Sequence, residues 1–104
     1  MVRSRSIIAT PPGATIKEQL NDRGMSQKEF AVRIDMSEKH VSKLINGEVQ
    51  LTPEVAVRLE IVLGVPARFW NNLEAIYREK LIKIAAEKKL LILLQCKNQN
   101  WLIS

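Results

Sequence analysis

Residues 27–46 read QKEFAVRIDMSEKHVSKLIN, and this stretch decides the fold that the sequence predicts. It holds two short segments in which apolar residues recur at three- and four-residue steps, as they do in amphipathic helices. The apolar positions are Phe30, Ala31 and Ile34 in the first segment and Val41, Leu44 and Ile45 in the second. The small Ala31 lets two such helices approach closely where they cross. The pattern therefore predicts a helix-turn-helix over residues 26–46, in which the first helix braces the second.

Capping residues mark where both helices begin. Ser26 and Glu29 have the spacing of a capping box, and Ser37 is placed to cap the second helix. Asn46-Gly47 is expected to end that helix. The turn between the helices contains Asp35 where glycine is usual, because this position often needs a positive φ. Aspartate tolerates that conformation better than most residues, although at some cost.

Start and stop signals elsewhere predict three further helices. The proline pair at residues 11–12 sets an extended entry to a first helix, which we expect over about 14–23. A fourth helix is expected from the Thr52-Pro53-Glu54 start to Gly64, and a fifth over residues 66–86. The fold class predicted from this pattern is all-α.

The chain is expected to divide into three parts. Residues 1–12 form an N-terminal arm, residues 13–86 form the helix-turn-helix domain, and residues 87–104 form a C-terminal extension. The run Leu90–Leu94 fits either a buried helix end or a strand, and residues 97–100 could form a turn, so the sequence does not determine the structure of this extension.

Composition limits the class of protein. The chain has 104 residues, of which 46% are hydrophobic, which is enough for one domain with its own core. The net charge of +5 favours a polyanionic partner, although residues 81–104 hold more of the excess than residues 1–80. The single cysteine, Cys96, excludes an intramolecular disulfide and fits a reducing cytoplasm. The longest apolar run, Leu90–Leu94, is far shorter than the ~20 residues of a membrane-spanning helix, and no signal peptide is expected.

The second helix of the pair carries polar residues on the face that its apolar residues leave outside. These residues are Glu38, Lys39, Ser42 and Lys43, with His40 near the edge of the face. Such side chains can contact base edges and phosphates in a DNA major groove. Gln27 and Ser37, at the starts of the two helices, are placed for phosphate contacts. The alternative is an ordinary helical hairpin whose polar face is merely solvated.

The fifth predicted helix carries more large apolar side chains than one small domain needs. We therefore expect it to hold a homodimer together, since two reading helices about 34 Å apart bind DNA far better than one. The predicted dimer interface comprises Trp70, Leu73, Tyr77 and Leu81. Phe69 and Trp70 could instead belong to the core.

The sequence offers little evidence for a metal site, a catalytic site or a further DNA contact. His40 is the only histidine and has no cysteine or carboxylate cluster around it in the sequence, so we expect no metal site and no cofactor. No catalytic set can be assembled, and we expect no enzyme activity; a small basic nuclease is the alternative that composition leaves open. Arg3 and Arg5 could reach a minor groove as a flexible arm or could be unstructured.

Residues 11–81 resemble the HigA/VapI-type antitoxins of the Cro/C1 (XRE) helix-turn-helix family. The motifs that carry the resemblance are Pro11-Pro12-Gly13, Met25-Ser26-Gln27, Val41-Ser42-Lys43-Leu44-Ile45-Asn46-Gly47, Leu51-Thr52-Pro53-Glu54 and Phe69-Trp70-Asn71-Asn72-Leu73. The resemblance covers about two thirds of the chain. Asp35 departs from the usual glycine and puts the turn geometry in doubt, and residues after about 86 match no pattern of the family.

The resemblance implies a five-helix, lambda-repressor-like domain that homodimerises and binds a palindromic operator in its own promoter. It adds Asn46 to the operator-facing set, which then comprises Gln27, Ser37, Glu38, Lys39, His40, Ser42, Lys43 and Asn46. It also implies a toxin partner, typically a HigB-like mRNA endonuclease that the antitoxin neutralises. Two alternatives remain: a phage-type or host repressor without a toxin, and an antitoxin that binds DNA weakly or not at all.

Overall fold

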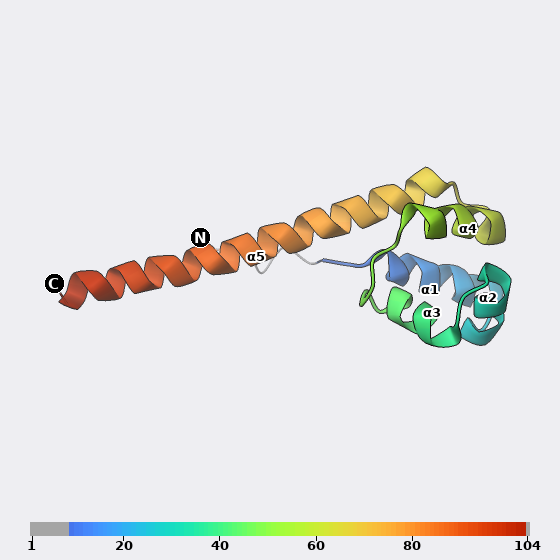
Figure 1. Ribbon diagram of the computed structural model, residues 1–104, viewed down its shortest axis with the longest axis horizontal. Coiled ribbons are helices and arrows are strands. Elements are labelled where there is room, and N and C mark those ends of the chain that lie inside the picture. The colour runs from blue at the N-terminus through green and yellow to red at the C-terminus, as the bar shows by residue number, and fades with distance from the viewer. Residues whose placement is uncertain (1–8, 104) are drawn as a thin grey trace. The chain divides into compact units, whose positions relative to one another are not determined.

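The computed structural model describes residues 9–103, and side-chain surroundings for residues 9–95. Its described part contains the helices α1 Pro12–Arg23, α2 Gln27–Ile34, α3 Glu38–Ile45, α4 Pro53–Leu63 and α5 Ala67–Ile103, with no strand among these residues (Figure 1). The predicted all-α class is confirmed. The predictions for Arg3 and Arg5 concern positions outside the described residues.

The chain divides into two compact units, one of which covers Thr10–Tyr77 and holds α1 to α4 with the first turns of α5. This unit ends earlier than the expected boundary at residue 86. The other unit includes Arg78–Ile103, the remainder of α5. Among all the residues that the structure describes, none of the helices combines the length and the apolar character of a membrane span.

The fifth helix is longer than the segment over which its pattern was predicted. That pattern runs to about residue 86, and the structure of residues 87–104 was undetermined, with a turn at 97–100 as one possibility, whereas the backbone stays helical to Ile103. The physical reason is the absence of any glycine or proline from residues 78–103, which are rich in Leu, Lys and Ile. Without a stop signal, these mostly favourable propensities continue the helix.

Side-chain caps hold the starts of the three central helices. The hydroxyl oxygens of Ser26, Ser37 and Thr52 accept hydrogen bonds from backbone N–H groups three residues later, at 3.0, 3.0 and 3.2 Å. The reciprocal half of the expected capping box is replaced, because the Glu29 carboxylate accepts from Arg33 at 2.8 Å. Each start is therefore fixed by a local interaction that the sequence alone shows.

The core lies within the first unit and is built from apolar side chains of all five helices and of the loop before α4. Its buried members are Ile16, Leu20, Phe30, Ala31, Ile34, Val41, Leu44, Ile45, Leu51, Ala56, Leu59, Leu63 and Trp70. Trp70 is 0% exposed, and its indole N–H donates to the carbonyl of Val65 at 3.2 Å. This placement corrects the expectation that Trp70 contributes to a dimer interface, because a side chain with no exposed surface cannot contact a second copy.

One helix crossing depends on a glycine. Gly13 lies in the first turn of α1, and a Cβ atom at this position would overlap the backbone carbonyl group of Ile45 at the end of α3. Backbone atoms cannot move aside as the end of a flexible side chain can. The absence of a side chain at Gly13 therefore lets α1 support the end of α3 directly.

We predict that Gly13→Ala lowers the free energy of unfolding by about 3 kcal/mol or more, because the clash outweighs the ~1 kcal/mol that alanine gains in helix propensity. Gly24→Ala is the matched control. Gly24 has φ 65°, but a methyl group at this position would meet nothing within 4 Å, so only the left-handed backbone penalty of roughly 1–2 kcal/mol applies. Urea denaturation of both variants measures the difference; equal losses would contradict the close approach.

Candidate nucleic-acid interface

The helix α3 has a buried face and a polar face. Val41, Leu44 and Ile45 are buried against the core, and Ser37 caps the N-terminus of the helix. Lys39, Ser42, Lys43 and Asn46 are spaced by three or four residues, so they share the opposite side. Burial of one face thus holds the other in a defined direction.

The structure places the predicted DNA-binding residues at or near the surface. Ser37, Glu38, Lys39, His40, Lys43 and Asn46 are exposed, while Gln27 and Ser42 are half-buried. Within the described residues, neither Lys39 nor Lys43 forms an ion pair with a carboxylate. Their ammonium groups are therefore available to an external anion such as a phosphate.

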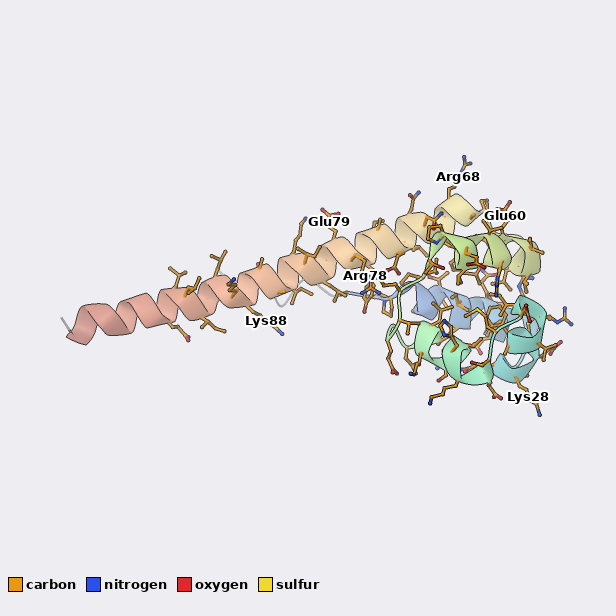
Figure 2. The ribbon with its side chains drawn as sticks, viewed as in Figure 1. Lys28, Glu60, Arg68, Arg78, Glu79 and Lys88 are labelled. Atoms are coloured by element: carbon orange, nitrogen blue, oxygen red, sulfur yellow. The ribbon has the colours of Figure 1, made fainter. Side chains whose placement is uncertain are left out.

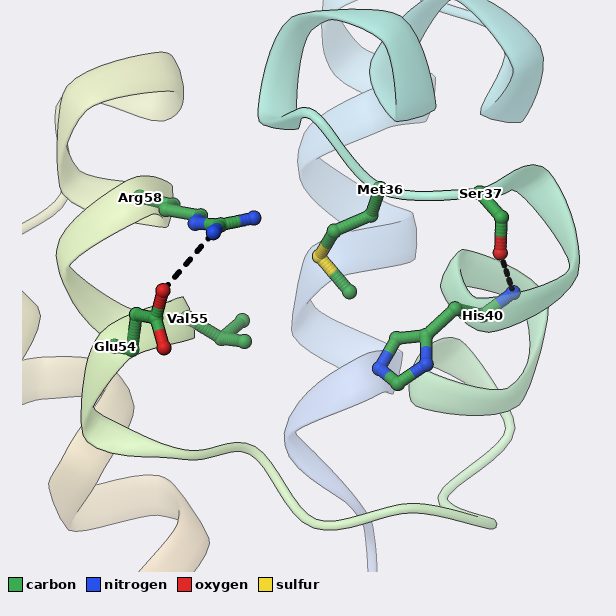
Figure 3. Close-up of a pocket in the computed structure, with 6 residues that line it drawn as sticks. All are labelled: Met36, Ser37, His40, Glu54, Val55 and Arg58. Carbon is green, nitrogen blue, oxygen red and sulfur yellow. Dashed lines mark hydrogen bonds and ion pairs between the residues drawn. The ribbon is translucent and has the colours of Figure 1, made fainter.

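A hollow separates the start of α3 from α4. It is lined by Met36, Ser37, His40, Glu54, Val55 and Arg58 (Figure 3). His40, which was predicted at the edge of the polar face, borders this hollow. In the described part of the chain, no group of three metal-ligating side chains is close enough to hold a metal ion.

Lys28 was not among the predicted DNA-binding residues. This lysine follows Gln27 in the first turn of α2, is exposed, and points away from the helix (Figure 2). Its position next to Gln27 in the first turn of α2 was the signal that could have identified it as a cation near a helix N-terminus.

The turn between α2 and α3 has the geometry that glycine usually provides. Asp35 has φ 60° and ψ 52°, in the left-handed region. Its N–H donates to the carbonyl of Val32 at 3.3 Å, and the N–H of Met36 donates to that of Ala31 at 3.0 Å. These are the two hydrogen bonds of a Schellman motif, so the aspartate leaves the turn geometry intact.

This arrangement of two capped helices joined by a tight left-handed turn agrees with a comparison with known protein families. Residues 16–70 match the family model described as helix-turn-helix. The chain belongs to the helix-turn-helix family. It is a DNA-binding regulator of that family.

Individual proteins similar to this chain include a transcriptional regulator and an antidote protein. The chain is 36% identical over 63 residues to the HTH-type transcriptional regulator YddM of Escherichia coli K12, covering 61% of this chain and 67% of the relative. A solved structure from Nostoc punctiforme, assigned to the antidotes of plasmid maintenance systems, matches with a TM-score of 0.76 and 25% identity over 80% of this chain and 91% of that one.

Two further solved structures are similar. The addiction module antidote protein of a HigA family from Coxiella burnetii matches with a TM-score of 0.71 and 28% identity, over 81% of this chain and 90% of that one. The Pseudomonas aeruginosa antitoxin HigA, solved with the higBA promoter, matches with a TM-score of 0.73 over 80% of this chain and 91% of that one. Its 23% identity supports a shared fold.

We predict that Asp35→Gly raises the free energy of unfolding by about 0.5–1 kcal/mol, because glycine adopts the left-handed conformation without a Cβ penalty. Asp35→Ala, which keeps a Cβ atom, is the control and is expected to be no more stable than the natural chain. Thermal and urea denaturation provide the measurement. A loss of stability in the glycine variant would show that the turn does not hold a positive φ in solution.

Proposed function

We propose that α3 reads the major groove of a specific operator and that the chain represses transcription by occupying this site. The observation that carries the proposal is the polar face of α3, in which Lys39 and Lys43 are exposed and unpaired while the opposite face is buried. Gln27 and Ser37 lie at helix N-termini, where backbone N–H groups favour phosphate contacts. The remaining proposed contacts come from Glu38, His40, Ser42 and Asn46.

The operator is proposed to be palindromic and to be bound by a homodimer. One eight-residue reading helix spans only a few base pairs, so a second copy related by a two-fold axis supplies the missing affinity and specificity. We place the dimer contact on α5. Leu73 is half-buried against the core, Tyr77 and Leu81 are half-buried, and Ile76 next to them is 49% exposed.

The biological role proposed here is that of an antitoxin in a type II toxin–antitoxin module, acting in the cytoplasm. The match to antidote proteins over about nine tenths of their length supports this role. By the same likeness, the partner is a HigB-like mRNA endonuclease that the chain neutralises.

The alternative is a transcriptional repressor without a toxin partner, which the relative described only as a transcriptional regulator favours. A neighbouring gene that encodes a toxic protein distinguishes the antitoxin from the plain repressor, provided that the toxic protein binds this chain.

DNA binding is tested with duplexes that the wild-type chain enriches from a random-sequence library. We predict that the double variant Lys39→Ala/Lys43→Ala loses at least about a hundredfold in affinity for the enriched duplex, because both base-edge and phosphate contacts are removed. The slope of log affinity against log salt concentration should also decrease by about one for each of the two lysines that contacts a phosphate. Lys17→Ala, an exposed lysine on α1, is the control. Retained binding by the double variant in a gel shift would refute the assignment of α3.

The dimer is tested by charge insertion. We predict that Ile76→Asp converts the dimer into a monomer in analytical ultracentrifugation, because it buries an unpaired carboxylate in the contact, and that operator affinity falls with it. Ile61→Asp is the matched control, since Ile61 is an apolar residue of α4 that is 78% exposed. If only the Ile61 variant dissociates, the dimer contact lies on α4 and the proposed location on α5 is wrong.

A further inference from the structure

Arg58 of α4 forms hydrogen bonds to the turn of the helix-turn-helix. One guanidinium nitrogen, Nη1, donates to the backbone carbonyls of Ile34 at 3.3 Å and of Asp35 at 3.0 Å. The other, Nη2, donates to the carboxylate of Glu54 at 2.9 Å, one helical turn earlier on α4 (Figure 3). A single side chain thus connects α4 to the residues that end α2.

The two carbonyls lie where α2 itself supplies no donor. The last carbonyls of a helix have no partner within it. The Schellman hydrogen bonds use the carbonyls of Ala31 and Val32, and Arg58 supplies donors to Ile34 and Asp35. Its positive charge is also favourable at the negative end of the α2 dipole.

The same turn sets the direction of α3. Only Asp35, Met36 and Ser37 separate the end of α2 from the start of α3. Asp35 holds the left-handed conformation in this short connection, which an aspartate adopts less readily than glycine. A group that binds the carbonyl of Asp35 therefore acts directly on the angle between the bracing and reading helices.

We infer that Arg58 is a positioning residue for sequence recognition: it fixes the α2–α3 turn so that α3 meets base edges in the correct orientation. This inference rests on the proposed reading of DNA by α3. The carbonyl hydrogen bonds carry the effect, whereas the ion pair with Glu54 adds little, because the Glu54 side chain is 75% exposed. The competing role for Arg58 is a direct contact with a DNA phosphate.

The experiment compares Arg58→Met, Arg58→Lys and Glu54→Gln with the wild-type chain. Each is titrated with the duplex that the wild-type chain enriches and with a scrambled duplex, over a range of salt concentrations. We expect Arg58→Met to bind the enriched duplex about tenfold more weakly than the wild-type chain does, because its base contacts are misplaced; this is the scale of one good base contact. Affinity for the scrambled duplex and the salt slope should remain unchanged, and Glu54→Gln should change the enriched-site affinity less than about twofold.

The outcomes separate the possibilities. If Arg58→Met weakens both duplexes equally and lowers the salt slope by about one, Arg58 contacts a phosphate and the inference is overturned. Unchanged affinity for both duplexes overturns it as well. If thermal denaturation shows that Arg58→Met does not fold, Arg58→Lys decides. The lysine ammonium lies closer to the backbone than Nη1 and cannot bind the turn and Glu54 with separate nitrogens, so a retained ratio of enriched to scrambled affinity would contradict positioning. A wild-type chain that enriches no duplex would overturn the proposed function itself, whichever way the variants behave.

Discussion

The burial of the inner face of α3 is the interaction on which the rest of the structure depends. This helix has eight residues, too few to remain helical alone in water. Val41, Leu44 and Ile45 keep it helical by packing into the core, and the Ser37 cap defines its start. The polar residues on the opposite face are therefore held in fixed relative positions by packing on the buried face, which leaves their chemistry available for a partner.

Backbone contacts add what side-chain packing cannot provide. At Gly13 the end of α3 rests against α1 with no intervening side chain, and at Asp35 the chain turns through a left-handed residue into α3. The first constraint acts at the end of α3 and the second acts in the turn that leads to its start. Arg58 adds a third constraint, because it extends from α4 and donates hydrogen bonds to the carbonyls of the turn. The orientation of α3 is consequently determined by the whole first unit and not by the helix-turn-helix alone.

Much of this fold can be predicted from local sequence signals. The caps at Ser26, Ser37 and Thr52 and the glycine stops predicted α2, α3 and α4 because each signal acts within one helical turn. The full length of α5 was not predicted, although residues 78–103 contain no stop signal, because the apolar run Leu90–Leu94 fits a strand as well as a helix. Periodicity shows that a face is apolar without showing what covers it, so it left Trp70 between the core and a dimer interface until the structure showed it buried. The polar face of α3 was predicted by the same periodicity. The bridge from Arg58 could not be predicted, since its carbonyl acceptors are 23 and 24 residues away and only its spacing from Glu54 is visible in the sequence.

The charge of α3 bears on how this motif can bind DNA. Lys39 and Lys43 are offset in part by Glu38 within the same short helix. Residues 1–80 as a whole carry only a small positive excess. Non-specific attraction to phosphates scales with the number of cations that contact them, so one copy of this domain has few such contacts to offer. In the proposed binding mode, useful affinity comes from accurately placed base contacts and from their repetition in a second copy. If α3 reads DNA as proposed, its small charge makes orientation the critical property, and the constraints on the turn and on both ends of α3 then serve recognition as well as stability.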